Sequence, residues 1–416
     1  MTTQAPVARS SRIIAIDALR GFALLGILLM NIQSFAMIRA AYNNPTAYGD
    51  LNGMNLWVWI GNHIFADQKF MTIFSLLFGA GIVLMSKRID SNNQKYAHYR
   101  RMFWLLIIGM LHGYLLWSGD ILVMYAVCGS VVFLFRKTSP RRLVLLGLLG
   151  LCIASALPSW LLQSPQSPPS PEAIATMIEA EVAAYQGSWL QQMKYRVPHT
   201  LYKQTLLIAI WGLWRAGGLM LIGMALVKWE IITAKRSLNF YLTSIVVGFT
   251  IGLPLIIFGI NHHFANNWAY ESSIFNGHQF NYWGSLFVSA AYIGIIMQIS
   301  QVTRLMWLRK PLAAVGRMAL TNYLVQTIIC TFIFYGHGLA LFGTLERTNQ
   351  LLIVLAVWLF QITTSVIWLR YFQFGPFEWV WRVLTYQQMQ PLRQRTKGPS
   401  QNDELFIDTI STYANH

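Results

Sequence analysis

The chain has few charged residues. Asp, Glu, Lys and Arg make up only 11% of its 416 residues, whereas a soluble globular domain carries about 25%. Hydrophobic residues make up 55%. Because so few charges cannot cover a protein of this length with polar surface, we expect much of the chain to face lipid.

Cysteine is also scarce, and the common catalytic motifs are missing. Cys128, Cys152 and Cys330 each fall in an apolar run, and none forms a CxxC pair. We therefore expect neither a disulfide framework nor a metal site. The sequence contains no HExxH zinc motif, no P-loop, no dinucleotide-binding glycine pattern and no GxSxG nucleophile motif.

The net charge of +16 is not accompanied by a nucleic-acid-binding motif. The cations instead lie in short segments beside apolar runs, where they fix orientation in the membrane and meet anionic lipid headgroups. We expect membrane lipids as partners and no nucleic acid. The first apolar run is not followed by a small-residue cleavage site, which predicts a retained first span.

What the chain does have is a series of apolar runs, most of them near the ~20 residues that cross a bilayer. Clusters of Lys and Arg fall in every second gap, starting before the first run. The positive-inside rule then places both termini in the cytoplasm. The sequence predicts an all-α fold, a polytopic transmembrane bundle of about ten spans. The expected spans are 18–38, 56–86, 102–117, 120–136, 143–162, 205–227, 239–260, 283–301, 313–335 and 351–372.

We expect residues 1–390 to form a single transmembrane helical domain, followed by a polar cytoplasmic tail, 391–416. The segment 163–204 is predicted to be a periplasmic loop with an acidic, partly amphipathic helix at about 172–196. No internal repeat is visible, which disfavours an inverted-repeat transporter.

Two of the expected spans are irregular. The run 56–86 is too long for one straight crossing, and polar residues from Asn62 to Lys69 interrupt it. We interpret it as an interfacial or re-entrant half followed by a span from Phe70. The run 102–136 is expected to be a tight hairpin that turns at residues 117–120.

A histidine inside a span needs an explanation, because polar groups are expensive in the membrane. His112 lies in the periplasmic half of the third expected span, and Asp120 follows just past the turn. A tight hairpin would bring the carboxylate to the imidazole, fixing its tautomer and raising its basicity. The alternative is a structural histidine bonded to a carbonyl.

Three basic residues at the ends of expected spans could also have either a structural or a functional role. Asp17 and Arg20 share a helix face at the cytoplasmic start of the first span, as an ion pair or as a phosphate-binding arginine held by a carboxylate. Arg317 opens the ninth span near the same membrane face, so the two arginines could grip a phosphorylated cofactor or lipid phosphates. Lys69 lies close to Asp67 and could simply snorkel to the interface.

Arg215 lies near the middle of the sixth span. An unpaired arginine there would cost about 2.5 kcal/mol or more, so it requires an acidic partner, a water-filled cavity or a bound anion. Asn31 in the first span could bond a neighbouring helix or polarise a carbonyl. Asn322 and Tyr323 lie deeper in the ninth span than Arg317.

Five stretches of the chain resemble the YeiB family of bacterial inner-membrane proteins, described by domain of unknown function 418. They carry the motifs around Asp17, Arg20 and Asn31, around Lys69 and Gly79, around His112 and Asp120, at 316–323 and at 375–382. The resemblance runs through nearly the whole chain. It implies a multi-pass protein of the bacterial inner membrane.

The opening stretch is also similar, more distantly, to that of the transmembrane acyltransferases, including heparan-alpha-glucosaminide N-acetyltransferase. Those enzymes carry an acyl group from cytoplasmic acyl-CoA to an acceptor on the far side, using a histidine and a nearby asparagine. Asn31 matches the asparagine. The stretch 39–60 contains no histidine, so His63 or His112 would take that role.

The function that we expect is therefore acyl transfer. In this reading His112, oriented by Asp120, deprotonates the acceptor, Asn31 stabilises the oxyanion, and His63 is the alternative base. The acyl-CoA donor needs no metal, and its predicted contacts are Arg20, Lys69, Arg317, Asn322, Tyr323 and Arg215. The other expected partners are a periplasmic or lipid-linked acceptor and a second copy of the chain in a homodimer.

Two other functions stay open. In a transporter or lipid-handling protein, Arg215, Asn322, Lys69 and Asp67 would line a pathway and no covalent product would form. In a non-catalytic membrane partner, the periplasmic segment 163–204 would recruit another protein.

Overall fold

The computed structural model describes residues 13–86, 91–161, 170–269 and 277–394. The regular elements in these ranges are helices, apart from one isolated bridge between Phe372 and Arg393, so the all-α prediction is confirmed. The α-helices are α1 (Ile14–Ala36), α2 (Arg39–Asn43), α3 (Gly53–Phe65), α4 (Lys69–Ser86), α5 (Ser91–Leu111), α6 (Leu122–Val132), α7 (Pro140–Leu161), α8 (Pro171–Gln186), α9 (Trp189–Tyr202), α10 (Leu213–Lys228), α11 (Leu238–Ala265), α12 (His278–Gln301), α13 (Met306–Arg317), α14 (Ala319–Phe334), α15 (Arg347–Tyr371) and α16 (Pro376–Tyr386).

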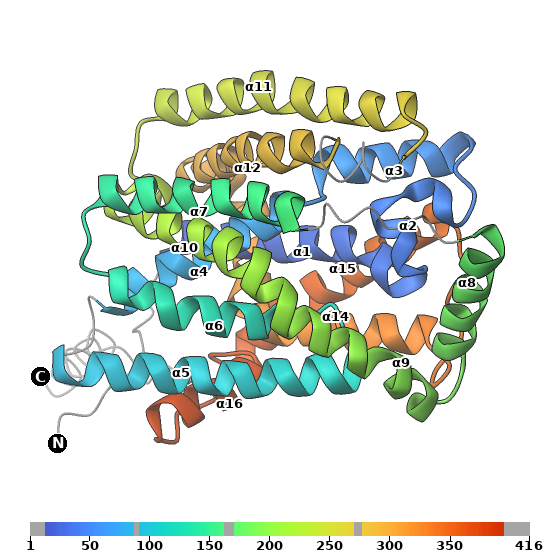
Figure 1. Ribbon diagram of the computed structural model, residues 1–416. Helices are drawn as coiled ribbons and strands as arrows, with labels where there is room; N and C mark the ends of the chain where they lie inside the picture. Colours follow the sequence, from blue (N-terminus) through green and yellow to red (C-terminus); the bar gives the residue numbers. More distant parts are fainter. Residues whose placement is uncertain (1–12, 87–90, 162–169, 270–276, 395–416) are drawn as a thin grey trace, which may run out of the picture.

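These are the helices of a multi-pass membrane protein. The described residues contain seven candidate spans, and an eighth if Thr303–Arg317 and Ala319–Phe334, which meet at a bend of 79°, are taken together. The long helices lie roughly parallel to one another (Figure 1). The seven helical segments that are long and apolar enough to cross a bilayer are Ile14–Ala36, Gly53–Ser86, Pro140–Pro158, Trp189–Lys228, Leu238–Ala265, His278–Gln301 and Arg347–Tyr371.

The two other expected spans, 102–117 and 120–136, form the expected hairpin. Helix α5 runs on into a wider π-helical turn, His112–Leu116, and the chain then turns back into α6. The apolar helix after the turn, Leu122–Phe135, is shorter than the seven candidate spans.

The predicted interruption of the second span is confirmed. Helix α3 ends at Phe65 and α4 begins at Lys69. Between them, Gln68 adopts a left-handed backbone with φ of 66°, which an amino acid with a side chain rarely does. At this break the Gln68 N–H donates to the sulfur of Met30 on α1 at 3.4 Å instead of to a helix carbonyl.

The expected single helix at 172–196 is wrong, because the structure has two. Helix α8 ends at Gln186, and α9 begins at Trp189 after a capping box: the Ser188 hydroxyl accepts the Gln191 N–H, and the Gln191 side chain accepts the Ser188 N–H. This reciprocal cap starts a new helix. The opening of the 163–204 segment, up to residue 169, and most of the predicted tail, from residue 395, lie outside the described residues.

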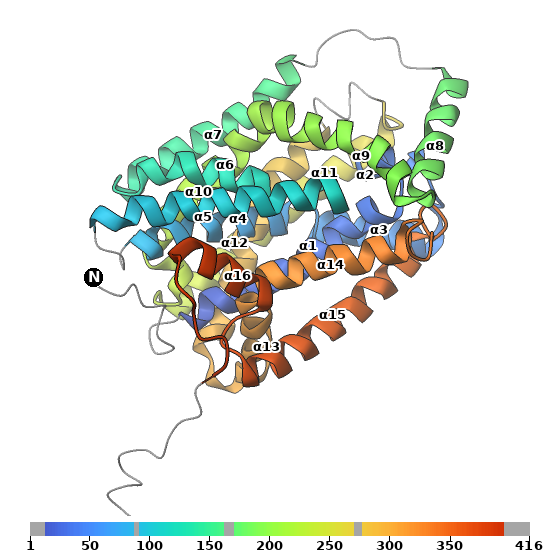
Figure 2. The same cartoon turned by 90° about the horizontal axis from the view of Figure 1, so that it is seen from below.

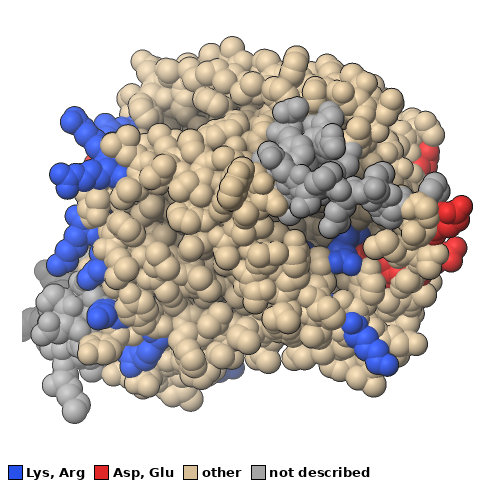
Figure 3. Space-filling view, in the orientation of Figure 1, with Lys and Arg blue, Asp and Glu red and all other residues tan. Residues whose placement is uncertain are grey.

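Lys and Arg gather mainly at one end of the molecule, over the start of α7 and the connection from α10 to α11. Asp and Glu gather at the opposite end, over α8 (Figure 3). We call these the basic end and the acidic end. Helices α1 and α4 lie inside the bundle, whereas α7, α11 and α15 lie at its periphery, where only 22–28% of each apolar span is buried within the protein.

Helix α16 closes the basic end by packing on α5 and α14 (Figure 2). Its Glu378 accepts backbone N–H groups of Leu320 and Thr321 at 2.5 and 3.0 Å and the Thr321 hydroxyl at 2.6 Å. The carboxylate thus caps the N-terminus of α14. Burial raises the pKa of Glu378, and the hydrogen bonds from Thr321 oppose that rise.

Replacing Glu378 with alanine is expected to destabilise the protein by about 1–3 kcal/mol, because it leaves buried donors without an acceptor. Glu378→Gln keeps one acceptor oxygen and should fall between alanine and the native residue. The apparent Tm in detergent measures both. Glu230→Ala, which removes a half-exposed partner of Lys235, is the control and should leave the Tm nearly unchanged. Equal Tm values for Glu378→Ala and Glu230→Ala would contradict the capping role.

Candidate functional site

A cavity of about 60 Å³ lies at the break between α3 and α4. Its lining comes from α3 and the break itself, from α2, from the end of α11 and the residues just after it, and from the first turn of α12. The cavity therefore lies in the half of the bundle toward the acidic end. The lining residues are Tyr42, Asn43, Trp59, His63, Asp67, Gln68, His263, Trp268, His278 and Asn281.

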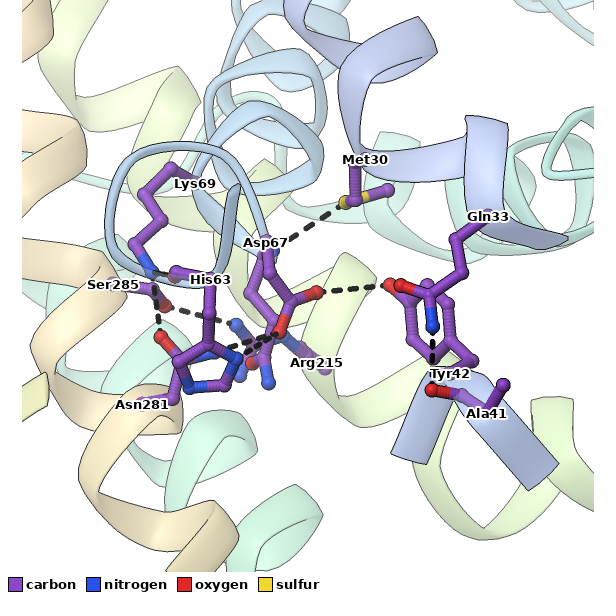
Figure 4. Close-up of polar contacts among 11 residues, drawn as sticks. Met30, Gln33, Ala41, Tyr42, His63, Asp67, Lys69, Arg215, Asn281 and Ser285 are labelled. Carbon is purple, nitrogen blue, oxygen red and sulfur yellow. Dashed lines mark hydrogen bonds and ion pairs between the residues drawn. The ribbon is translucent and has the colours of Figure 1, made fainter. Parts of the chain in front are cut away.

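Asp67 is the centre of the polar network around this cavity (Figure 4). Its Oδ1 accepts the Tyr42 hydroxyl at 2.9 Å, and its Oδ2 accepts the Asn281 Nδ2 at 2.7 Å. His63 Nδ1 lies 3.6 Å from the same Oδ2. One carboxylate therefore links α2, α3 and α12.

Lys69 begins α4 just after the residues that line the cavity, and it is fully buried. Its ammonium donates to the backbone oxygen of His63 and to Asn281 Oδ1, each at 2.6 Å. The sequence placed Lys69 beside Asp67, and the structure connects the two through Asn281. A lysine held by two such bonds away from the surface is not snorkelling.

Arg215 on α10 joins the same region. Its guanidinium is fully buried, lies 4.0 Å over the Tyr282 ring and donates to the Ser285 hydroxyl at 3.3 Å. It is within electrostatic range of Asp67 and Tyr42. The carboxylate lies beyond ion-pair distance, so the acidic partner that the sequence allowed for Arg215 does not form a direct contact.

His63 is one of the residues that line the cavity. Its ring stacks on Trp59 at 5.2 Å, and its side chain is 16% exposed. Among the described residues, none hydrogen-bonds its Nε2 atom. This nitrogen is therefore available to a molecule in the cavity.

His112 differs from His63 in its surroundings. The predicted pairing with Asp120 forms, with 2.8 Å between Nδ1 and Oδ1, and both side chains are only 1% exposed. Its second nitrogen, Nε2, lies 2.9 Å from the hydroxyl of Thr327. Both ring nitrogens are thus occupied, and Asp120 also accepts the Val123 N–H at 2.9 Å, which fixes the turn of the hairpin.

The structure brings Tyr323 to this second site and leaves Asn322 apart from it. The Tyr323 ring lies 5.1 Å from the His112 ring, and its hydroxyl accepts the Ile121 N–H at 3.4 Å. Asn322 donates to Ser365 on α15 at 2.9 Å. Asn31 is buried on α1, next to Met30, whose sulfur accepts the Gln68 N–H at the helix break.

Arg20 and Arg317 lie at the basic end, where α1 crosses α13. Gly21 and Gly316 are in backbone contact at this crossing, so the neighbouring arginines flank it. Arg20 pairs with Asp17 at 2.9 Å, as their spacing predicted. Arg317 donates to the backbone oxygen of Gln373 at 3.0 Å.

Two further arginines, which the sequence did not single out, extend this basic cluster. Arg101 on α5 lies within electrostatic range of both Arg20 and Arg382, and its guanidinium stacks on Trp381 at 4.3 Å. Arginines from α1, α5 and α16 therefore face one region of the basic end. Among the described residues, no three His, Cys, Asp or Glu side chains lie close enough to hold a metal ion.

Comparison with known proteins places this architecture in a family. The family described as "Protein of unknown function (DUF418)" matches residues 226–388. The "Uncharacterized protein YeiB" of Escherichia coli (strain K12) is 34% identical over 397 residues, which cover 92% of this chain and 99% of the relative. The chain belongs to the DUF418 family. The "Uncharacterized protein YxaH" of Bacillus subtilis (strain 168) is 29% identical over 95% of this chain and 100% of the relative.

The matched DUF418 region, 226–388, contributes part of the cavity wall that sequence reasoning missed. His262 and His263 lie beyond the predicted span 239–260, but α11 continues through Ala265 and places His263 on the cavity. Its ring stacks on Trp268 at 4.3 Å. Asn281 could not be identified from the sequence as a site residue, because its partners lie more than 200 positions away.

Proposed function

We propose that this DUF418 protein is a membrane acyltransferase, which moves an acyl group from cytoplasmic acyl-CoA to an acceptor at the periplasmic side. The observation that carries the proposal is the histidine–carboxylate pair His63–Asp67 on the wall of a cavity inside the bundle. Acyl transfer to a hydroxyl or amine uses a histidine base that is oriented by a carboxylate at one ring nitrogen and can take a proton at the other.

The proposal assigns the base to His63 rather than to His112. A general base must come within about 3 Å of the proton it removes. His63 borders the cavity with Nε2 open, whereas His112 is almost fully buried with both nitrogens bonded. The 3.6 Å separation between His63 and Asp67 is long, but such contacts often tighten only when substrate binds.

The proposed reaction is a direct transfer. The acceptor oxygen or nitrogen attacks the thioester carbonyl while His63 Nε2 takes its proton. The resulting oxyanion is stabilised by the carboxamide of Asn31, the role implied by the resemblance to transmembrane acyltransferases. The carbon–sulfur bond then breaks, and the coenzyme A thiolate leaves with the proton that His63 returns.

The donor would bind from the basic end. Arg20 and Arg382 each lie within electrostatic range of Arg101 there, and guanidinium groups are suited to the phosphates of acyl-CoA. A bilayer core is ~30 Å thick, so the pantetheine arm must enter the bundle to bring the thioester to the cavity. The proposal therefore includes an opening between the helices that admits this arm.

The proposed topology follows from the same charge distribution. The basic end is assigned to the cytoplasm of a bacterial inner membrane by the positive-inside rule. With the bent pair α13–α14 and the α5–α6 hairpin both crossing, the chain makes ten spans and both termini are cytoplasmic. The acidic end, with α8 and α9, is then periplasmic.

Acetyl-CoA and longer acyl-CoAs are expected to raise the Tm of the detergent-purified protein, because a ligand that binds only the folded state stabilises it. At a concentration of 100 times Kd the stabilisation is about 2.7 kcal/mol. Arg20→Ala and Arg382→Ala should each reduce the shift, whereas Arg236→Ala, which removes a cation near the α10–α11 connection, should not.

No shift with any acyl-CoA at millimolar concentration would contradict the donor site. A shift that Arg20→Ala and Arg382→Ala leave unchanged would contradict its assignment to the basic cluster.

A transporter or lipid-handling protein is the second candidate, and one observation favours it. The cavity lies at a broken helix beside buried cations, as substrate sites of secondary transporters do. Substrate flux into liposomes without any covalent product would support this function over acyl transfer.

A further inference from the structure

The guanidinium of Arg215 is buried with more hydrogen-bond donors than acceptors around it. Among the described residues, its Nε and Nη1 atoms are inaccessible to solvent and have no hydrogen-bond acceptor. Its other contacts are to neutral groups: Nη2 donates to the Ser285 hydroxyl, and the guanidinium lies against the side chains of Tyr282 and Trp211. Arginine keeps its charge in proteins. A buried donor left unpaired costs about 1–3 kcal/mol, and more when it is charged, so these atoms need an acceptor that the described part of the chain does not provide.

The nearby carboxylate is already engaged. Asp67 accepts hydrogen bonds from Tyr42 and Asn281, and it lies too far from Arg215 for an ion pair. Lys69 adds a second fully buried cation on the other side of Asn281. The described residues of this site therefore hold two basic side chains around one carboxylate, in an interior where unpaired charge is expensive.

We propose that Arg215 and Lys69 bind the negatively charged group, a carboxylate or a phosphate, of a molecule that enters through the cavity and reaches past Asp67 and Asn281. Neither cation lines the cavity itself, and Figure 4 shows both beside His63 and Asp67 at the α3–α4 break. An oxyanion at this site gives acceptors to the unpartnered guanidinium donors. It also offsets the excess positive charge.

This inference rests on the proposed function in one respect, because it identifies the bound molecule as an anionic acyl acceptor. The donor phosphates belong to the basic cluster of Arg20, Arg101 and Arg382, and the cavity lies toward the opposite end. An acidic group held at Arg215 and Lys69 would fix the acceptor so that a neighbouring hydroxyl or amine faces His63. The site thus selects acceptors by charge.

The test uses the full-length protein in detergent without any acyl-CoA. Sodium acetate and sodium phosphate are titrated separately against the apparent Tm, with sodium chloride at matched ionic strength as the salt control. At least one oxyanion is expected to raise the Tm in a saturable way that chloride does not reproduce. The stronger of the two identifies the ligand group as a carboxylate or as a phosphate.

Arg215→Gln is expected to weaken the apparent affinity for that oxyanion at least 10-fold, and Lys69→Gln to weaken it less. Arg215→Lys, which keeps the charge, should retain part of the binding even where Arg215→Gln does not fold. Arg236→Gln is the matched control and should bind like the wild type. Equal effects of chloride and both oxyanions on the wild type, or undiminished binding by folded Arg215→Gln, would overturn the proposal.

The outcome is independent of the acyl-CoA measurement. If an oxyanion binds but no acyl-CoA does, the anion site is supported and the acyltransferase proposal fails. If an acyl-CoA binds but no oxyanion does, the acyltransferase proposal is supported and the charged acceptor is ruled out.

Discussion

His63→Ala is expected to slow the proposed acyl transfer by about 10²- to 10⁴-fold, the contribution of a positioned general base, while the protein stays folded. The side chain borders the cavity and no described residue hydrogen-bonds its Nε2, so its loss removes a proton acceptor without breaking a buried network. The rate of coenzyme A release from acetyl-CoA, with water or the native acceptor receiving the acyl group, measures the effect. The Tm of the same sample reports the fold.

The corresponding change at the other histidine should give the opposite pattern. His112→Ala removes two buried hydrogen bonds, to Asp120 and Thr327, and is expected to lower the Tm rather than the rate per folded molecule. His262→Ala, which changes a histidine of α11 outside the cavity lining, is the control. A full rate in His63→Ala together with an inactive but stable His112→Ala would move the base to His112.

Gly79→Val is expected to prevent α4 from packing on α10. A Cβ atom at Gly79 would lie 1.9 Å from the backbone oxygen of Met220, and one at Gly223 would lie 1.9 Å from that of Leu76. These are backbone contacts, which a rotamer change cannot relieve. Overpacking a core side chain costs about 1–3 kcal/mol, and a clash with backbone costs more, so we expect little folded protein.

The same helix offers a matched control. Gly81 lies two residues away, and a Cβ atom there would meet nothing within 4 Å. Gly81→Val makes the same chemical change in α4 and should leave the yield and the Tm close to those of the wild type. Similar losses for both variants would show that helix propensity, not the α4–α10 contact, limits stability. Size-exclusion profiles and Tm values in detergent distinguish the two outcomes.

The features predicted correctly from the sequence are those with a local signal. The break after α3 follows from polar residues in an apolar run, and the approach of Asp120 to His112 follows from a short turn. Asp17 and Arg20 pair because they are three positions apart on a helix. In each case the interacting groups lie within about a dozen positions, so the helical period or the turn length determines their approach.

The cavity could not be predicted in the same way. Asp67 meets Asn281 across 214 positions, and Lys69 meets it across 212. Such contacts depend on which helices become neighbours, and this sequence alone carries little information on helix order in the bundle. The sequence favoured His112 over His63 although each has a carboxylate close by in the chain, Asp120 and Asp67, because the cavity beside His63 is formed by these distant contacts.

One local signal was present and was missed. Gly187, Ser188 and Gln191 form a helix stop followed by a capping box, which predicts two helices where one was expected. The prediction of one helix rested on the charge of the segment 163–204 and did not use its capping residues. Capping patterns therefore deserve equal weight with charge in extramembrane segments of such proteins.

The most direct test of acyl transfer follows a labelled acyl group across the membrane. Inside-out vesicles from cells that make this protein expose the cytoplasmic face and carry the native acceptor. With radiolabelled acetyl-CoA outside, the account predicts that label accumulates in a covalent product facing the vesicle lumen, and that His63→Ala vesicles accumulate at least 100-fold less. Equal labelling in wild-type, His63→Ala and protein-free vesicles, with the acetyl-CoA unconsumed, would contradict the account.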